Sequence, residues 1–163
     1  IWDPGSVAQM LDAGVGAQVT LLLGGKTDSP AMDLLGRPIS VSGTVRCITD
    51  GRFVVTGPMA TGSRMNMGRT AVLRVGSIDI VISERRHEPF DTGCFTHAGI
   101  DPAAKRYVLI KSRQHFRAGF DPIAKHVVLV AGPGVCSSNY EAFGFKNLRR
   151  PIYPLDIDTS RNA

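Results

Sequence analysis

The sequence predicts an α+β fold, in which antiparallel β-hairpins pack with a β-α-β unit and short helices in a single domain. Two hairpin patterns lie between residues 39 and 82, each with apolar residues on both sides of a turn. The apolar runs at 107–110 and 127–130 are separated by too many residues for a tight hairpin, so they are predicted to be parallel strands joined by a crossover. A chain of 163 residues is long enough for one domain with its own core.

The chain opens with a helix signal. Asp3 followed by Pro4 is typical of a helix start, because Asp caps the first turn and Pro fits the first helical position. Gly14 is expected to end this helix. The largely apolar run at 19–23 then predicts a strand that stops at Gly24.

The two predicted hairpins come next. Residues 39–49 alternate apolar and polar side chains, and Asp50 with Gly51 predicts a type I′ turn from which residues 53–55 return as the partner strand. The second hairpin is predicted at 71–82, with its turn in the middle of that range.

A repeated pattern precedes both strands of the predicted β-α-β unit. Residues 99–105 and 119–125 share the sequence Gly-x-Asp-Pro-x-Ala-Lys. We interpret each copy as one helical turn capped by its Asp, because two copies are too few for a solenoid. Upstream of the first copy, Asp91 is the expected cap of a short helix that ends near Gly99.

Composition excludes several classes of protein. Charged residues make up 20% of the chain, and the net charge of +5 comes from scattered basic residues without interleaved aromatic ones, so neither nucleic-acid binding nor a membrane span is expected. The three cysteines are odd in number and far apart, which predicts no disulfide framework and favours a reducing, cytoplasmic location.

No complete metal or nucleophile motif is present. His87, His97 and His126 have no second ligand at helical spacing, so no metal site is predicted within this chain. Ser6 lacks the Gly-x-Ser-x-Gly pattern of a hydrolase nucleophile, and no base adjoins Cys136.

One polar cluster stands out, at the junction between the first predicted crossover strand and its helix. It contains Lys111, Ser112, Gln114, His115 and Arg117. Ligands collect at the carboxyl ends of strands in α/β arrangements, and helix N-termini attract anions. We therefore expect the substrate-binding residues here.

Each member of this cluster also has a purely structural interpretation. His115 could donate a hydrogen bond to a substrate carbonyl or transfer a proton, or it could bond a nearby backbone carbonyl at a helix start. Arg117 and Lys111 could hold a carboxylate, or they could pair with an acid such as Asp121. The hydroxyl and amide of the cluster could be helix caps.

The run KSRQHFRAGF at 111–120 and the tail RRPIYPLD at 149–156 resemble the C-terminal domain of the microcystinase C (MlrC) type zinc metallopeptidases. The segments at 1–4, 22–26 and 56–59 are similar to that family as well. The resemblance covers nearly the whole chain, and the two longer motifs together are its most specific part.

The resemblance implies a parent enzyme that uses zinc to hydrolyse small peptides, with the metal ligands in a larger N-terminal domain. Residues 1–163 would then be a fragment with no complete catalytic site and no zinc of its own. The chain starts at Ile1 rather than Met, which we interpret in the same way. Matched position adds Ser137 to the substrate-binding candidates.

The expected partners follow from this interpretation. They are the N-terminal metal-binding domain of the same protein and a small peptide substrate, with no nucleic acid and no membrane. An absent partner domain would leave an apolar surface exposed, which self-association into a homo-oligomer could cover. The alternative interpretation is a non-catalytic binding or interaction domain.

Overall fold

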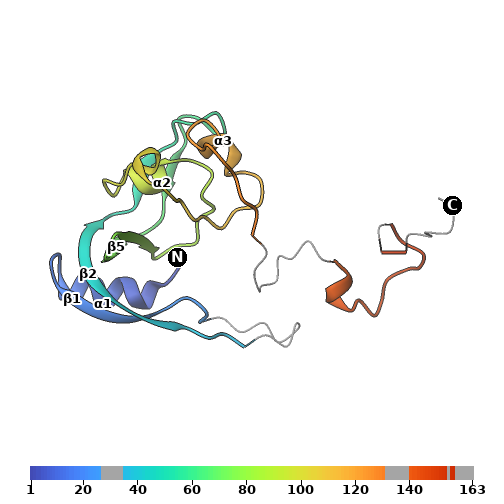
Figure 1. Cartoon of the computed structure of the whole chain (residues 1–163), viewed down its shortest axis with the longest axis horizontal. Coiled ribbons are helices and arrows are strands. Elements are labelled where there is room, and N and C mark those ends of the chain that lie inside the picture. Colours follow the sequence, from blue (N-terminus) through green and yellow to red (C-terminus); the bar gives the residue numbers. More distant parts are fainter. Residues whose placement is uncertain (27–34, 131–139, 154, 157–163) are drawn as a thin grey trace. The chain divides into compact units, whose positions relative to one another are not determined.

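The computed structural model describes residues 1–26, 35–130, 140–153 and 155–156 (Figure 1). The chain divides into two compact units, one formed by Ile1–Lys26 with Arg37–Val128 and the other by Thr27–Gly36 with Leu129–Ala163. Among the described residues, every strand lies in the first unit, together with a helix near the N-terminus and several short helices. The second contains the short 3-10 helix η3 (Tyr140–Phe143).

A four-stranded antiparallel sheet forms the centre of the first unit, with its strands in the order β1, β2, β5, β6. The strands are β1 (Gln18–Leu23), β2 (Ile39–Thr49), β5 (Thr70–Val75) and β6 (Ile78–Ser83). A separate two-stranded sheet pairs β3 (Arg52–Val54) with β4 (Arg64–Asn66). These antiparallel sheets and short helices confirm the predicted α+β class.

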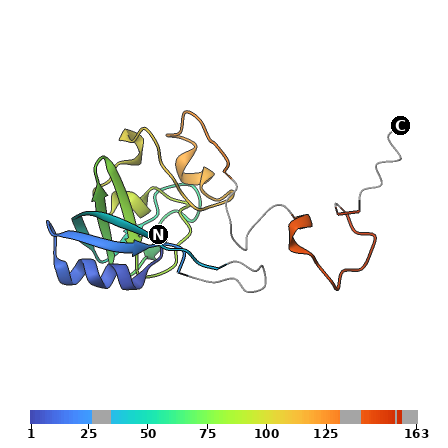
Figure 2. The ribbon, with the colours of Figure 1, turned by 60° about the horizontal axis from the view of Figure 1, so that its bottom comes forward.

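The helix α1 (Pro4–Ala13) covers one face of the large sheet, as Figure 2 shows. Its start is the one expected from sequence, because the Asp3 carboxylate accepts a hydrogen bond from the Ser6 N–H at 3.1 Å. The Lys26 ammonium lies 2.7 Å from the same carboxylate. The helix and sheet share one buried apolar cluster, formed by Val7, Met10, Leu21, Leu23, Val45, Ala71, Leu73 and Ile82.

One predicted hairpin is confirmed and the other is wrong. The strands β5 and β6 form the hairpin expected around Gly76, which has a φ of 57°. The strand β2 does not turn back onto β3 at Asp50 and Gly51. It pairs with β1 on one edge along its first half and with β5 on the other edge along its second half, while β3 pairs with β4 in a separate sheet.

The predicted β-α-β unit is not formed. Residues 107–110 and 127–130 belong to no strand, and the helix between them is the single turn α3 (Arg117–Phe120). The apolar composition of the two runs was the basis of the prediction, but a strand also requires a neighbour to complete its hydrogen bonds. No strand of the described chain pairs with either run.

A second apolar cluster supports the short helices. Buried Cys94 of α2 (Gly93–Thr96), together with Phe116 and Phe120 at α3, packs around Met67. Ile110 also packs against this cluster. Figure 1 shows α2 and α3 on the side of the unit away from α1. The polar cluster at 111–117 is thereby fixed to the rest of the unit through its apolar neighbours.

The chain reaches this region through a well-anchored turn. The Asp101 carboxylate accepts the Ala103 N–H at 2.9 Å and so caps η2 (Pro102–Ala104), as the repeated pattern predicts for its first copy. The Lys105 ammonium then lies 2.7 Å from Asp79 of β6. In the second copy Asp121 follows α3 instead of starting a helix, and it pairs with Arg117.

Candidate functional site

The polar cluster surrounds the start of α3. Phe116 and Phe120 are buried in the apolar cluster beneath this helix, whereas His115 and Arg117 are exposed. Phe116 and Phe120 therefore fix the orientation of α3, with Arg117 between them and His115 immediately before them at the surface. The helix α3 is labelled in Figure 1.

Glu88 is the residue that organises the cluster. The Ser112 hydroxyl donates a hydrogen bond to Oε1 of Glu88 at 2.7 Å, and Nδ1 of His115 lies 3.0 Å from Oε2 of the same carboxylate. The Ser112 hydroxyl also accepts the backbone N–H of Phe116 at 3.2 Å. Ser112 thus joins Glu88 to the start of α3. The Glu88 carboxylate contacts two side chains of the polar cluster, those of Ser112 and His115.

The charge on Glu88 determines which nitrogen of His115 carries a proton. The hydrogen bond from Ser112, followed by that from His115, lowers the pKa of Glu88, so its carboxylate is ionised at neutral pH. An ionised carboxylate only accepts hydrogen bonds, so Nδ1 of His115 must be the protonated nitrogen. In the neutral ring Nε2 then keeps its lone pair and can accept a hydrogen bond, and in the protonated ring Nε2 is a second donor.

The segment that carries Glu88 is rigidly held. Three backbone N–H groups donate to the buried carboxylate of Asp91, from Thr56 at 3.2 Å and from Gly57 and Gly93 at 2.7 Å each. A Cβ at Gly119 would lie only 2.7 Å from the Phe90 carbonyl oxygen, so a residue without a side chain is needed where α3 approaches this segment. The separation of Glu88 from His115 is therefore set by backbone packing.

Two further histidines lie near this segment but serve a different purpose. The rings of His87 and His97 lie 5.5 and 5.8 Å from the Phe53 ring, measured between centroids. Burial lowers the pKa of both histidines. They pack as neutral aromatic side chains and do not contribute to the exposed cluster.

The remaining predicted site residues differ in whether their side chains have a partner. Arg117 forms an ion pair with Asp121 at 3.3 Å, so the structural alternative predicted for it does occur, with both side chains largely exposed. Lys111 and Gln114 are exposed, and within the described residues their side chains make no hydrogen bond or ion pair. Ser137 lies outside the described residues.

Sequence reasoning did not identify Glu88 as a site residue. It lies in a charged turn 24 residues before Ser112 and 27 before His115, and no spacing rule connects these positions. The structural alternative for His115 invoked a nearby backbone carbonyl, whereas the structure gives it a carboxylate from a distant segment. Only the tertiary packing of α3 on residues 90–91 reveals this partner.

The described residues do not fit a metal ion. In the part of the chain that the structure describes, no three His, Cys, Asp or Glu side chains come together in a group that could hold one. The Glu88 and His115 pair supplies two such groups, but their shared hydrogen bond already engages Nδ1. This chain therefore offers an oriented histidine, and no metal-ligand set is found among its described residues.

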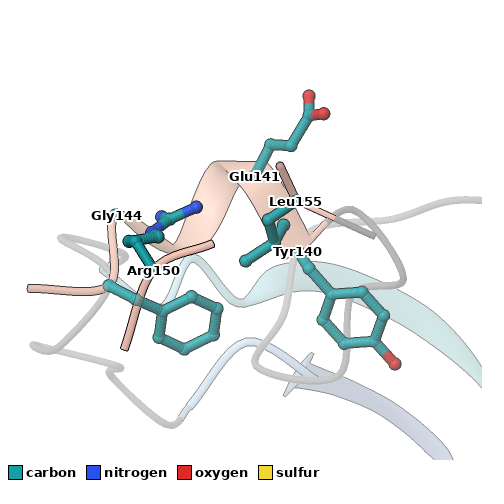
Figure 3. A pocket seen from close by; sticks show the side chains of 6 residues that line it. Tyr140, Glu141, Gly144, Arg150 and Leu155 are labelled. Atoms are coloured by element: carbon teal, nitrogen blue, oxygen red, sulfur yellow. The ribbon is translucent and has the colours of Figure 1, made fainter. Parts of the chain in front are cut away.

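The second unit contains a hollow of about 210 Å³ bordered by Tyr140, Glu141, Gly144, Phe145, Arg150 and Leu155 (Figure 3). An ion pair of 2.6 Å between Arg150 and Asp156 engages the one basic side chain in this border. Ligand sites usually enclose ~300 Å³ or more. We therefore place the candidate site at Glu88 and His115.

No helix within the described residues has the length and apolar character needed to cross a bilayer.

Residues 1–147 match the family described as MlrC C-terminus. Microcystinase C from Sphingomonas sp. is 31% identical over 156 residues, which are 96% of this chain and 28% of that protein. A solved structure from Mesorhizobium sp. BNC1, provisionally described as a metallopeptidase, shares 26% identity with a TM-score of 0.78 and is matched by 96% of this chain over 30% of its own length.

The chain thus spans less than a third of the length of each relative. The match to the family covers nine-tenths of the chain and includes Glu88, Ser112 and His115. The chain belongs to the MlrC C-terminus family.

Proposed function

We propose that this chain is the part of a peptide-hydrolysing metalloenzyme that completes the substrate cleft and presents His115, oriented by Glu88, to the substrate. The observation that carries the proposal is the carboxylate of Glu88 shared between Ser112 at 2.7 Å and His115 at 3.0 Å. The relatives support the class of enzyme, because one is named Microcystinase C and the other is described as a metallopeptidase.

The chemistry assigned to His115 follows from its hydrogen bond. Peptide hydrolysis places negative charge on the carbonyl oxygen of the scissile bond, and a donor aimed at that oxygen lowers the barrier. Protonated His115 can donate from Nε2, while Glu88 accepts from Nδ1 and holds the ring in position. Lys111, Gln114 and Arg117 are proposed to bind the rest of the peptide, with Ser112 acting through Glu88.

The metal of such an enzyme would be held elsewhere in the full-length protein. We propose zinc, bound by an N-terminal metal-binding domain that is the partner of this chain. The described residues offer no ligand set for it. The role proposed for His115 does not require this chain to bind the metal.

The test compares His115→Ala with His126→Ala in the full-length protein. Both residues are exposed histidines, and within the described residues the His126 side chain has no hydrogen-bond partner. Loss of a positioned acid or electrostatic donor should lower kcat/KM for a small peptide about 10²- to 10⁴-fold, with unchanged metal content. Equal kcat/KM for both variants would remove His115 from the site.

A non-catalytic binding domain is the second candidate function. The exposed apolar residues at 107–109 and 127–130 favour it, because patches of this kind occur at interaction surfaces. The same pair of variants separates the two functions. A binding domain would retain partner affinity in both, and neither variant would change the rate of peptide hydrolysis.

A further inference from the structure

The two apolar runs that flank the site are unusually exposed. Tyr107 is 73% exposed and Leu109 is 88% exposed, whereas Ile110 beside them packs against the cluster under α3. Val128 is 79% exposed, and the next two residues, also apolar, are exposed to a similar degree. Water contact at these large apolar side chains is unfavourable relative to full burial.

The backbone of the same runs is unpaired as well. Within the described residues, the N–H and C=O groups of 107–110 and 127–130 form no hydrogen bonds. In the first run Leu109 points outward and Ile110 inward, an alternation that suits a strand with one covered face. β-branched and aromatic side chains beside unpaired backbone groups are the features of a sheet edge that binds another strand.

We propose that residues 107–110 and 127–130 are sheet strands that pair with extended segments of the full-length protein lying outside these 163 residues. The pairing would hydrogen-bond both backbones and cover Tyr107, Leu109 and Val128. The relatives support this occupant over a second copy, because about 70% of the length of each lies beyond the part that this chain matches.

The pairing also has a consequence for the site. Residues 111–126 connect the two runs, so His115 would lie on a segment fixed at both ends to the partner sheet. This deepens the proposed function, on which it rests for the presence of a partner domain. Under this proposal the partner domain binds by adding strands to these two runs, at the border of the proposed cleft.

Amide hydrogen exchange of the full-length protein tests the pairing without any substitution. We expect amides of 108–110 and 127–130 to exchange as slowly as those of the central strand β5, because each would be hydrogen-bonded within a sheet. Exchange as fast as at the β5–β6 turn would overturn the inference. Protection that disappears on dilution would assign the strands to a second copy and would overturn it equally.

A matched pair of variants adds a second measurement. Val128→Asp and Val15→Asp in the full-length protein place the same charge at exposed valines, one in the proposed interface and one in the turn after α1. We expect a lower thermal midpoint for Val128→Asp only, and equal midpoints would contradict the pairing. The exchange result does not depend on His115, so loss of activity in His115→Ala with fast exchange would refute the pairing and leave the proposed function intact.

Discussion

The sheet covered by α1 and the segment 107–130 differ in two respects. These are how fully their backbones pair with neighbouring strands and how fully their apolar side chains are buried. In the sheet every strand has a paired neighbour, and the apolar side chains between sheet and helix are buried. In the segment the apolar runs are exposed, and its regular structure is the single turn α3. Both regions carry similar apolar runs, so the difference comes from the presence or absence of a pairing partner.

This difference indicates a division of roles. The sheet and α1 supply stability, while the segment presents polar side chains and unpaired edges at the surface. The two are joined by the cluster around Phe116 and Phe120 and by the Asp91 hydrogen bonds. Functional surfaces are commonly built in this way, with binding residues on connecting segments held by a rigid scaffold.

The largest expected effect compares two leucines. Leu73→Ala removes a fully buried side chain from the sheet core and should lower the free energy of unfolding by ~2–5 kcal/mol. Leu109→Ala in the same 163-residue chain should change it by less than ~0.5 kcal/mol, because Leu109 is exposed. Urea unfolding of both variants measures the difference, and similar losses would show that the two regions are packed alike.

Asp91→Ala tests the connection between the two regions. It removes the acceptor of three backbone N–H groups in a buried position, which should cost ~3 kcal/mol or more of the free energy of unfolding. Asp101→Ala is the control, because it removes an exposed cap that accepts one N–H and should cost ~1 kcal/mol. An equal cost for both would mean that Asp91 does not hold the site segment.

Two half-buried histidines, His87 and His97, predict a dependence of stability on pH. Burial lowers the pKa of His87 and His97 below the ordinary value of 6.5, with partial opposition from Glu88 and Asp91 near His87 and from Asp50 near His97. As the pH falls below 6.5 the unfolded chain binds protons before the folded one does, so the free energy of unfolding decreases. It should be highest above pH 6.5 and fall steadily towards pH 5.

Substitution of His97 isolates its part of this effect. His97 stacks on Phe53 and its ring nitrogens have no partner within the described residues, so His97→Phe should flatten the decrease between pH 7 and pH 5. Denaturant midpoints at several pH values provide the measurement. The exposed His126 gives the control, since His126→Phe should retain the full decrease. A decrease that is unchanged in His97→Phe would contradict the assignment.

The smallest effect is expected at the ion pair of α3. Arg117 and Asp121 are both largely exposed, so Arg117→Met should change the free energy of unfolding by less than ~0.5 kcal/mol. A thermal scan at low and high salt checks this. A larger loss that disappears in salt would show that the pair stabilises the start of the site segment.

Local signals in the sequence predicted those elements that depend on a few neighbouring residues. Asp3 and Pro4 begin α1 as expected, and the β5–β6 hairpin forms around Gly76. The partner of β2 could not be predicted in this way, because β5 begins 21 residues after β2 ends and competes with the nearer β3. The turn signal at Asp50 and Gly51 carried no information about that competition.

The sequence predicted the residues around His115 but not their partner Glu88. The polar residues around His115 form a contiguous run that the sequence displays directly. Glu88 could not be found, because it reaches His115 through the close approach of Gly119 to residues 90–91. The runs at 107–110 and 127–130 had a strand composition, but strand formation depends on a partner that the described chain does not contain.

A double-mutant cycle on Glu88 and His115 in the full-length protein tests the central claim most directly. If Glu88 acts by orienting His115, Glu88→Gln should lower kcat/KM about 10- to 100-fold, and adding it to His115→Gln should cause no further loss. Glu84→Gln is the matched control, because Glu84 pairs with Arg69 and should leave kcat/KM unchanged. Wild-type activity in Glu88→Gln, or losses that multiply in the double variant, would contradict the account.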